Sequence, residues 1–175
     1  MFDFWLSIKD LPEQGQEFEV SDQEVWTVPI REFKIQARIT QNIEARFFIY
    51  PGQNGYLIRG GLRGAVKIPC DRCFATKEIR LEATFELFEE LEPAEKNDFY
   101  GQSFLRFSQG LPEINAGAML WEQFLLAQPI KHLCSDNCQG LCSKCGQNLN
   151  LAACTCGQDE PDPRMAIFRN MKIET

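Results

Sequence analysis

The eight cysteines of the chain fall into four close pairs, and their spacing is typical of zinc sites. The pairs are Cys70 with Cys73, Cys134 with Cys138, Cys142 with Cys145, and Cys154 with Cys156. A tetrahedral zinc ion takes four thiolates, and one tight turn supplies two of them when about two to four residues separate the cysteines. The first three pairs meet this requirement, whereas the fourth is tighter than usual. The sequence therefore predicts at least one zinc ion and favours two sites with four cysteine ligands each.

Three partitions into two sets of four remain if each close pair stays together. We favour one set of Cys70, Cys73, Cys134 and Cys138 and a second set of Cys142, Cys145, Cys154 and Cys156. The eight residues between Cys145 and Cys154 are enough to return the chain for a small closed site. The first set would then tie the middle of the chain to its last third.

Other uses of the cysteines compete with zinc. Disulfides belong to oxidising compartments, and the first residues lack the basic segment, apolar run and cleavage site of a signal peptide. An iron–sulfur cluster uses the same four thiolates and stays open as an alternative. A redox-active Cys-x-x-Cys needs a strand-to-helix turn, whereas Cys70 and Cys73 lie between two strand-like runs. We expect a cytoplasmic protein in which the cysteines bind metal.

Alternating hydrophobicity predicts the sheet that positions the first cysteine turn. Residues 31–40, 46–50, 56–69 and 77–87 alternate between apolar and polar side chains, the period of a strand with one buried face. Gly60, Gly61 and Gly64 indicate a bulge or a strong bend in the third of these runs. Residues 115–128 have the pattern of the one main helix, which Pro129 ends. We predict an α+β fold: an antiparallel β-sheet or partial barrel with one main helix and a C-terminal Cys-rich zinc-knuckle segment.

Three regions follow from this pattern. Residues 1–30 form an acidic N-terminal segment, with a strand near 2–8, that packs on or leads into the sheet. Residues 31–130 form a β-rich core that contains the helix at 115–128, an acidic linker at 89–101 and a possible edge strand at 104–107. Residues 131–175 form the Cys-rich zinc-binding segment and a short terminal helix from Asp162. The most apolar stretch, 116–130, is shorter than the roughly 20 residues that span a membrane, so we expect no membrane contact.

Charge is distributed unevenly along the chain. Residues 31–80 carry a net charge of +6, between two acidic blocks at 1–30 and 81–98 that each carry −6. The candidate RNA-binding residues of the basic band are Lys34, Arg38, Arg59, Arg63, Lys67 and Arg72, with Phe48, Tyr50 and Phe74 as stacking faces. The alternative is a solvated sheet face whose arginines and lysines pair with Glu78, Glu82 and Glu86. The acidic residues 82–98 could dock a basic protein, or act only as a soluble linker.

Few residues suit catalysis. His132 is the only histidine, and it is either an ordinary side chain or a replacement for one cysteine ligand. Trp121 belongs to the expected core. The sequence contains no Gly-rich phosphate loop, Gly-x-Ser-x-Gly or His-Glu-x-x-His motif, and a zinc ion with four thiolates has no open position for water. We expect a protein that is not an enzyme.

Several of these segments, in this order, resemble one family. The segments are Gly60–Cys73, the helix with Gln128–Lys131, Leu133–Asn150, and Asp162–Arg164 with the apolar residues that follow. Together they are similar to the YceD family, the large ribosomal RNA subunit accumulation proteins of bacteria and plastids. The resemblance implies a non-enzymatic ribosome-biogenesis factor needed for accumulation or processing of 23S ribosomal RNA. It also implies that the basic protein which residues 82–98 could dock is a ribosomal protein.

Two functional hypotheses follow. In the first, the protein binds 23S rRNA or a pre-ribosomal large subunit through the basic band. In the second, it is a zinc-bearing protein–protein adaptor without direct RNA contact, and its cysteines could make it sensitive to thiol chemistry. Phosphate contacts give an affinity that falls steeply with salt, whereas an apolar protein interface does not.

Overall fold

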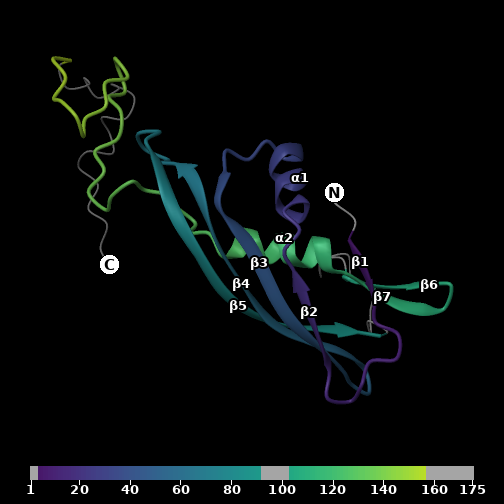
Figure 1. Cartoon of the computed structure of the whole chain (residues 1–175). Helices are drawn as coiled ribbons and strands as arrows, with labels where there is room; N and C mark the ends of the chain where they lie inside the picture. Colours follow the sequence, from purple (N-terminus) through teal and green to yellow (C-terminus); the bar gives the residue numbers. More distant parts are fainter. Residues whose placement is uncertain (1–3, 92–102, 157–175) are drawn as a thin grey trace, which may run out of the picture.

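A computed structural model describes residues 4–91 and 103–156 of the chain (Figure 1). The strands are β1 (Trp5–Ser7), β2 (Gln16–Val20), β3 (Arg38–Pro51), β4 (Gly55–Pro69), β5 (Thr76–Glu90), β6 (Leu105–Ser108) and β7 (Leu111–Asn115). The helices are α1 (Glu24–Glu32) and α2 (Ala116–Leu126). The predicted α+β class, with antiparallel sheets and a Cys-rich segment, is confirmed.

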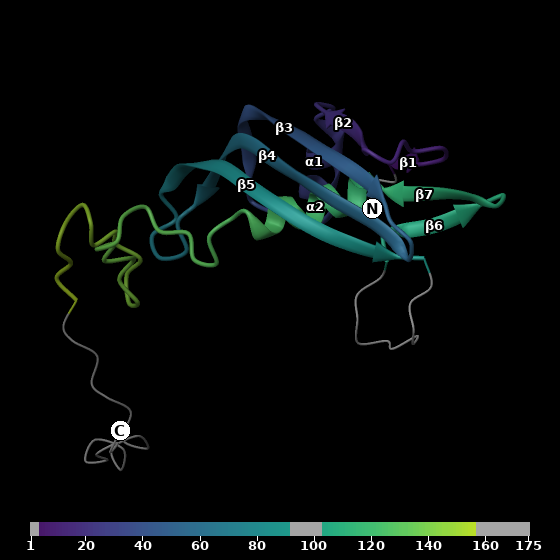
Figure 2. The ribbon, with the colours of Figure 1, turned by 90° about the horizontal axis from the view of Figure 1, so that it is seen from below.

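The larger sheet is antiparallel and has the strand order β2-β3-β4-β5. Strands β3, β4 and β5 run for 14, 15 and 15 residues, and Figure 2 shows them bending together along their length. The register of β4 with β5 is continuous from Gly55 opposite Glu90 to Pro69 opposite Thr76. The bulge that we expected near the glycines of β4 lies instead in β3, between Ile39 and Glu44, where the register with β4 shifts twice.

One face of this sheet forms the core with α1 and α2. The alternating apolar residues of β3, β4 and β5 point inward, and Phe47, Ile58 and Leu81 are all buried. From α2, Leu120 and Phe124 pack into the same cluster, and Asn115 caps this helix by accepting a hydrogen bond from the Ala118 backbone N–H. The polar residues between the buried ones lie on the opposite face, which the helices leave uncovered. We call it the exposed face.

A smaller sheet of order β1-β7-β6 positions the start of α2. β7 ends at Asn115, so the helix begins directly where the strand stops. The Glu89 carboxylate, at the end of β5, is buried and accepts hydrogen bonds from the Ser103 hydroxyl and the Phe104 backbone N–H. The predicted edge strand is confirmed, because β6 lies at the edge of this sheet.

Two elements differ from the sequence-based expectation. Residues 24–32 form helix α1, and β3 begins only at Arg38, so the strand expected over residues 31–40 was wrong for residues 31–37. Lys34, which has a positive φ of 53°, follows this helix and lies on no strand. Residues 16–20 form strand β2, within the segment that was expected only to be acidic. The terminal helix expected from Asp162 lies outside the described residues.

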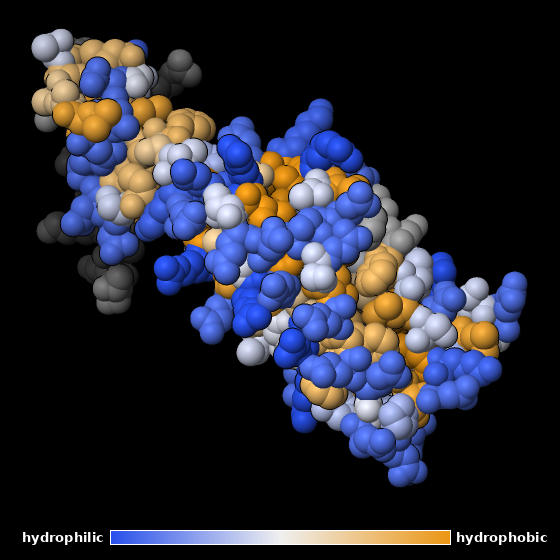
Figure 3. Space-filling view, in the orientation of Figure 1, coloured by the Kyte–Doolittle hydropathy of each residue, from blue (hydrophilic) through white to orange (hydrophobic). Residues whose placement is uncertain are grey.

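The cysteine-rich segment continues from α2 and forms an extension at one end of the molecule (Figure 1). Seen in Figure 3, the surface is mostly hydrophilic, with smaller hydrophobic patches on the body and on this extension. Among the described residues, no helix combines the length and apolarity needed to cross a membrane.

Candidate metal centres and charged sheet face

Set A consists of Cys70, Cys73, Cys134 and Cys138, whose sulfur atoms all lie within 4.8 Å of one another. The Sγ atoms of Cys70 and Cys138 are 3.7 Å apart, and those of Cys73 and Cys134 are 3.5 Å apart. Four thiolates around one zinc ion, at about 2.3 Å each, would be separated by about 3.8 Å. These separations are close to the ones that four ligands of a single tetrahedral ion require.

The hairpin between β4 and β5 supplies the first two cysteines of set A. Its turn is closed by hydrogen bonds from the backbone N–H of Cys70 to the Ala75 carbonyl and from that of Phe74 to the Cys70 carbonyl. Phe74 has a positive φ of 59°, a conformation that costs energy in any residue except glycine. Asp71 and His132 join this turn to the segment before Cys134, since each donates its backbone N–H to the other residue.

Set B consists of Cys142, Cys145, Cys154 and Cys156, whose sulfur atoms also lie within 4.8 Å of one another. Its first pair lies in a turn where the Gly146 backbone N–H donates to the Cys142 carbonyl, and Gly146 takes the positive φ, 73°, that favours glycine. A bridge between Leu141 and Asn148 closes this turn. The grouping of the cysteines that the spacing favoured is thus the one that the sulfur positions show.

Direct hydrogen bonds join the two sets into one unit. The Arg72 guanidinium donates to the Cys138 carbonyl at 2.8 Å, and the Leu141 N–H donates to the Arg72 carbonyl at 3.1 Å. The Asn150 amide, beyond the turn of set B, donates to the Sγ of Cys138 at 3.4 Å. Such bonds from outside the ligand shell orient the ligands and stabilise a thiolate.

The thiol pKa values indicate a shared negative charge in each set. Burial raises the pKa of Cys70, but backbone N–H groups around its sulfur, that of Arg72 among them, bring it down to about 6. The backbone N–H groups of Cys145 and Lys144 lower the pKa of Cys142 to about 6. The hydrogen bond with Cys145, together with burial, raises the pKa of Cys156 to about 12. One thiol in each set ionises easily while a neighbour resists, and a cation among them would let all four ionise.

Both sets could therefore hold a metal ion. The sulfur donors suit a soft or borderline ion such as zinc. All eight cysteines are free of disulfides. His132 belongs to neither set; it is half-buried, and its Nδ1 lies 3.7 Å from the Asp71 carboxylate.

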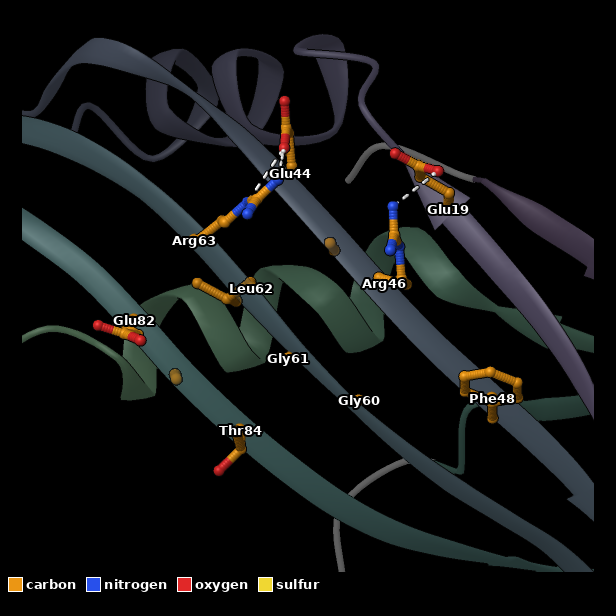
Figure 4. Close-up of a pocket in the computed structure, with 12 residues that line it drawn as sticks. Glu19, Glu44, Arg46, Phe48, Gly60, Gly61, Leu62, Arg63, Glu82 and Thr84 are labelled. Atoms are coloured by element: carbon orange, nitrogen blue, oxygen red, sulfur yellow. Dashed lines mark hydrogen bonds and ion pairs between the residues drawn. The ribbon is translucent and has the colours of Figure 1, made fainter.

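Ion pairs cover much of the exposed face of the sheet. Arg59 of β4 pairs with Glu86 of β5 at 2.6 Å, and Arg63 pairs with Glu44 of β3 at 2.8 Å. Arg46 of β3 pairs with glutamates of β2 in the same way. Two of these pairs, Arg63 with Glu44 and Arg46 with Glu19, line a shallow hollow of about 400 Å³ whose lining also includes Gly61 (Figure 4). Two of the four arginines expected to bind RNA, Arg59 and Arg63, thus already have carboxylate partners.

A group of cations without such partners lies at the cysteine end of this face. Arg38 stands opposite Lys67 in the register of β3 and β4, and Arg80 of β5 lies opposite Ala65, two residues along β4 from Lys67. Among the described residues, none of the three makes an ion pair, although Glu78 of β5 stands opposite Lys67 in the register. We call Arg38, Lys67 and Arg80 the basic row. The basic row includes two of the predicted RNA-binding residues, Arg38 and Lys67. Arg72, another of them, donates a hydrogen bond to the Cys138 carbonyl.

Sequence reasoning missed two members of these sites. Arg80 was not among the candidate RNA-binding residues, and its position near Lys67 depends on the register. The bond from Asn150 to Cys138 was also missed; Asn150 is held in this turn by two further hydrogen bonds to the Asn148 side chain. Trp121 is buried in the core, as expected. Phe48 and Tyr50 stack on each other at 6.0 Å on the exposed face.

Comparison with known proteins identifies relatives of the chain. The family model described as large ribosomal RNA subunit accumulation protein YceD matches residues 58–172. A protein of Arabidopsis thaliana, large ribosomal RNA subunit accumulation protein YCED homolog 1, chloroplastic, is 25% identical over 138 residues. That alignment covers 65% of this chain and 43% of the relative, so the chain spans less than half of its length. No solved structure gives a significant match. Because the family match covers more than half of its residues, and in agreement with the resemblance seen in its motifs, the chain belongs to the YceD family of large ribosomal RNA subunit accumulation proteins.

Proposed function

We propose that this protein is a non-enzymatic ribosome-biogenesis factor that supports accumulation or processing of 23S rRNA by binding that RNA, or a pre-ribosomal large subunit, directly. The family description and the name of the Arabidopsis relative both concern accumulation of large ribosomal RNA. The observation that carries the proposal is the basic row, three cations on neighbouring strands without carboxylate partners in the part of the chain that the structure describes.

The location of the basic row supports contact with phosphates. Its cations are exposed, and cross-strand neighbours lie about 5 Å apart, close enough to contact successive phosphates of one strand. Arg59 and Arg63 are less suited, because an RNA phosphate would first have to displace Glu86 or Glu44. We therefore place the contact at the cysteine end of the exposed face rather than along the whole of it.

Phe74 extends this surface beyond the sheet. It lies in the turn after Cys73, is 65% exposed, and is held in its left-handed conformation by the closed hairpin. An exposed aromatic ring beside cations is a stacking face for an unpaired base. Single-stranded RNA next to the basic row could use it.

Two zinc ions, one in each cysteine set, complete the proposed molecule. With four thiolates each, these ions would be structural, since no position is left for water. They would hold the cysteine-rich unit against the β4–β5 hairpin and so fix the position of the basic row relative to that unit.

The test is the salt dependence of binding between the full chain and a transcript of 23S rRNA. The variant Arg38→Gln with Lys67→Gln should lower the slope of log affinity against log salt by about two, because two phosphate contacts are lost. Two controls accompany it. Lys9→Gln with Arg106→Gln removes the same charge elsewhere, and Arg59→Gln with Glu86→Gln removes an ion pair without changing net charge. An equal loss in all three variants, or no binding by the unaltered protein, would reject the proposed contact.

A further inference from the structure

Strand β5 forms one edge of the larger sheet. In the described part of the chain it pairs only with β4, so the backbone groups on its outer side have no partner there. Within residues 4–91 and 103–156, none of the backbone hydrogen bonds found outside regular elements involves residues 76–90. In an antiparallel edge strand, about every second residue directs its N–H and C=O away from the sheet. A strand of 15 residues therefore offers a long ladder to another extended chain.

The side chains of β5 define which chain could pair there. Glu78, Glu82, Glu86 and Glu90 lie on the exposed face of this strand. The whole strand has five acidic and two basic residues, a net charge of −3. Only Glu86 of the four has an ion-pair partner in the described part of the chain. The other three make no ion pair among the described residues, although Glu78 and Glu82 stand opposite Lys67 and Arg63 of β4 in the register.

The other face of β5 is apolar and incompletely covered. Ile79, Ala83 and Leu87 alternate with the glutamates and pack against the core, but each is only partly buried. Apolar residues of an added strand would extend the core beyond them. The edge therefore fits a segment in which basic and apolar residues alternate.

A second copy of the chain fits this edge poorly. Pairing two β5 strands would bring two segments of net charge −3 together, and charges along an edge strand are a common protection against such self-association. A basic segment removes this repulsion and adds cross-strand pairs of opposite charge.

We propose that the edge of β5 receives an extended segment of a partner protein, with alternating basic and apolar residues, as a fifth strand of the sheet. Backbone hydrogen bonds would supply much of the affinity, and the glutamates would select the charge of the partner. The proposal does not depend on RNA binding, because it uses the backbone edge and the glutamates of β5. One residue of the basic row, Arg80, lies on the same strand between Glu78 and Glu82.

The probe is a capped nonapeptide of alternating lysine and valine, added to the full chain at low salt. We expect binding by fluorescence anisotropy and slower hydrogen exchange of the amides in residues 76–90. The variant Glu78→Lys with Glu82→Lys should bind at least about tenfold more weakly, because like charges then face each other. Its matched control, Glu24→Lys with Glu122→Lys, makes the same change of charge on the helices and should bind as the unaltered chain does.

A second peptide separates strand pairing from charge attraction. N-methylation of alternate residues along one edge removes the amide donors while keeping all charges, and should abolish binding. Equal binding of this peptide, protection outside β5, or no binding of the first peptide would overturn the proposal. A dimer in sedimentation experiments would also overturn it if the variant Glu78→Lys with Glu82→Lys altered that dimer, because the edge would then pair with a second copy of the chain.

Discussion

Set A and set B contain the same four thiolates but close very different lengths of chain. Set A joins residues 61 and 68 positions apart in the sequence, and three of its cysteines are at most 5% exposed. Set B draws all its ligands from residues 142–156, and Cys145 is exposed. A link that closes a long loop removes more conformational freedom from the unfolded chain than one that closes a short loop. With the same four ligands, set A therefore connects the sheet to the C-terminal segment, whereas set B connects only residues of one short segment.

The largest effect is expected from Cys73→Ser. Metal content should fall from two ions to one per chain, with loss of binding free energy on the order of 10 kcal/mol at set A. Residues 131–141 should lose their protection from hydrogen exchange, because the bonds to the hairpin depend on set A. Elemental analysis and hydrogen exchange measure both. Two ions retained per chain would show that set A does not bind metal through Cys73.

Cys145→Ser is the matched change in set B. It should also remove one metal ion, but increased exchange should stay within residues 142–156. Protection of the β4–β5 hairpin should remain, since none of the cysteines of set A has changed. If the hairpin lost as much protection as in Cys73→Ser, the conclusion that set B acts only on its own short segment would be wrong.

Acid should remove metal from both sets. Protons compete with the ion for thiolates, and at pH values below about 6 even the most acidic thiols, Cys70 and Cys142, become protonated. Because their pKa values are lowered in the folded chain, the stabilising contribution of these thiolates is present at high pH and is lost as the pH falls through about 6. Metal content after dialysis at a series of pH values should stay full at neutral pH and decline only below this range. Loss already above neutral pH would contradict it.

Asn150→Ala should have the smallest effect. The bond from its amide to the Sγ of Cys138 is the direct contact of the set B side with a ligand of set A. Loss of such a bond should lower the metal affinity of set A by about tenfold and leave set B unchanged. Asn137→Ala, next to Cys138 in the loop between Cys134 and Cys138, is the control. Competition with a chelator, measured for set A in the Cys145→Ser background and for set B in the Cys73→Ser background, would show the difference.

Strands β4 and β5, whose hairpin supplies two cysteines of set A, could be predicted from the sequence because each has one buried face. In β5, Leu81 and Phe85 alternate with exposed glutamates, and the pattern depends on nothing outside the strand. The cysteine pairs could be predicted for a similar reason, because the spacing of metal ligands is a local property of the sequence. In both cases the information lies within a few residues.

Elements that depend on distant partners were missed. Helix α1 contains Pro29 and is stabilised by packing, with Trp26 against Phe124 of α2 at 5.9 Å. Phe33 and Ile35, just after it, imitate a strand. The prediction for the basic band was incomplete for the same reason. Its arginines could be assigned to one face, but the strand register decides that Arg59 lies opposite Glu86 and that Arg38 lies opposite Lys67.

The most direct test of RNA binding by the basic row is ultraviolet crosslinking of the tagged protein in its own cells, with sequencing of the attached RNA. The unaltered chain is compared with Arg38→Glu, Lys67→Glu and Arg80→Glu combined. Crosslinks concentrated in 23S rRNA that vanish in the variant, while its metal content stays at two ions, are the expected result. Crosslinks that persist in the variant, or no enrichment of 23S rRNA with the unaltered chain, would contradict direct RNA binding by this surface.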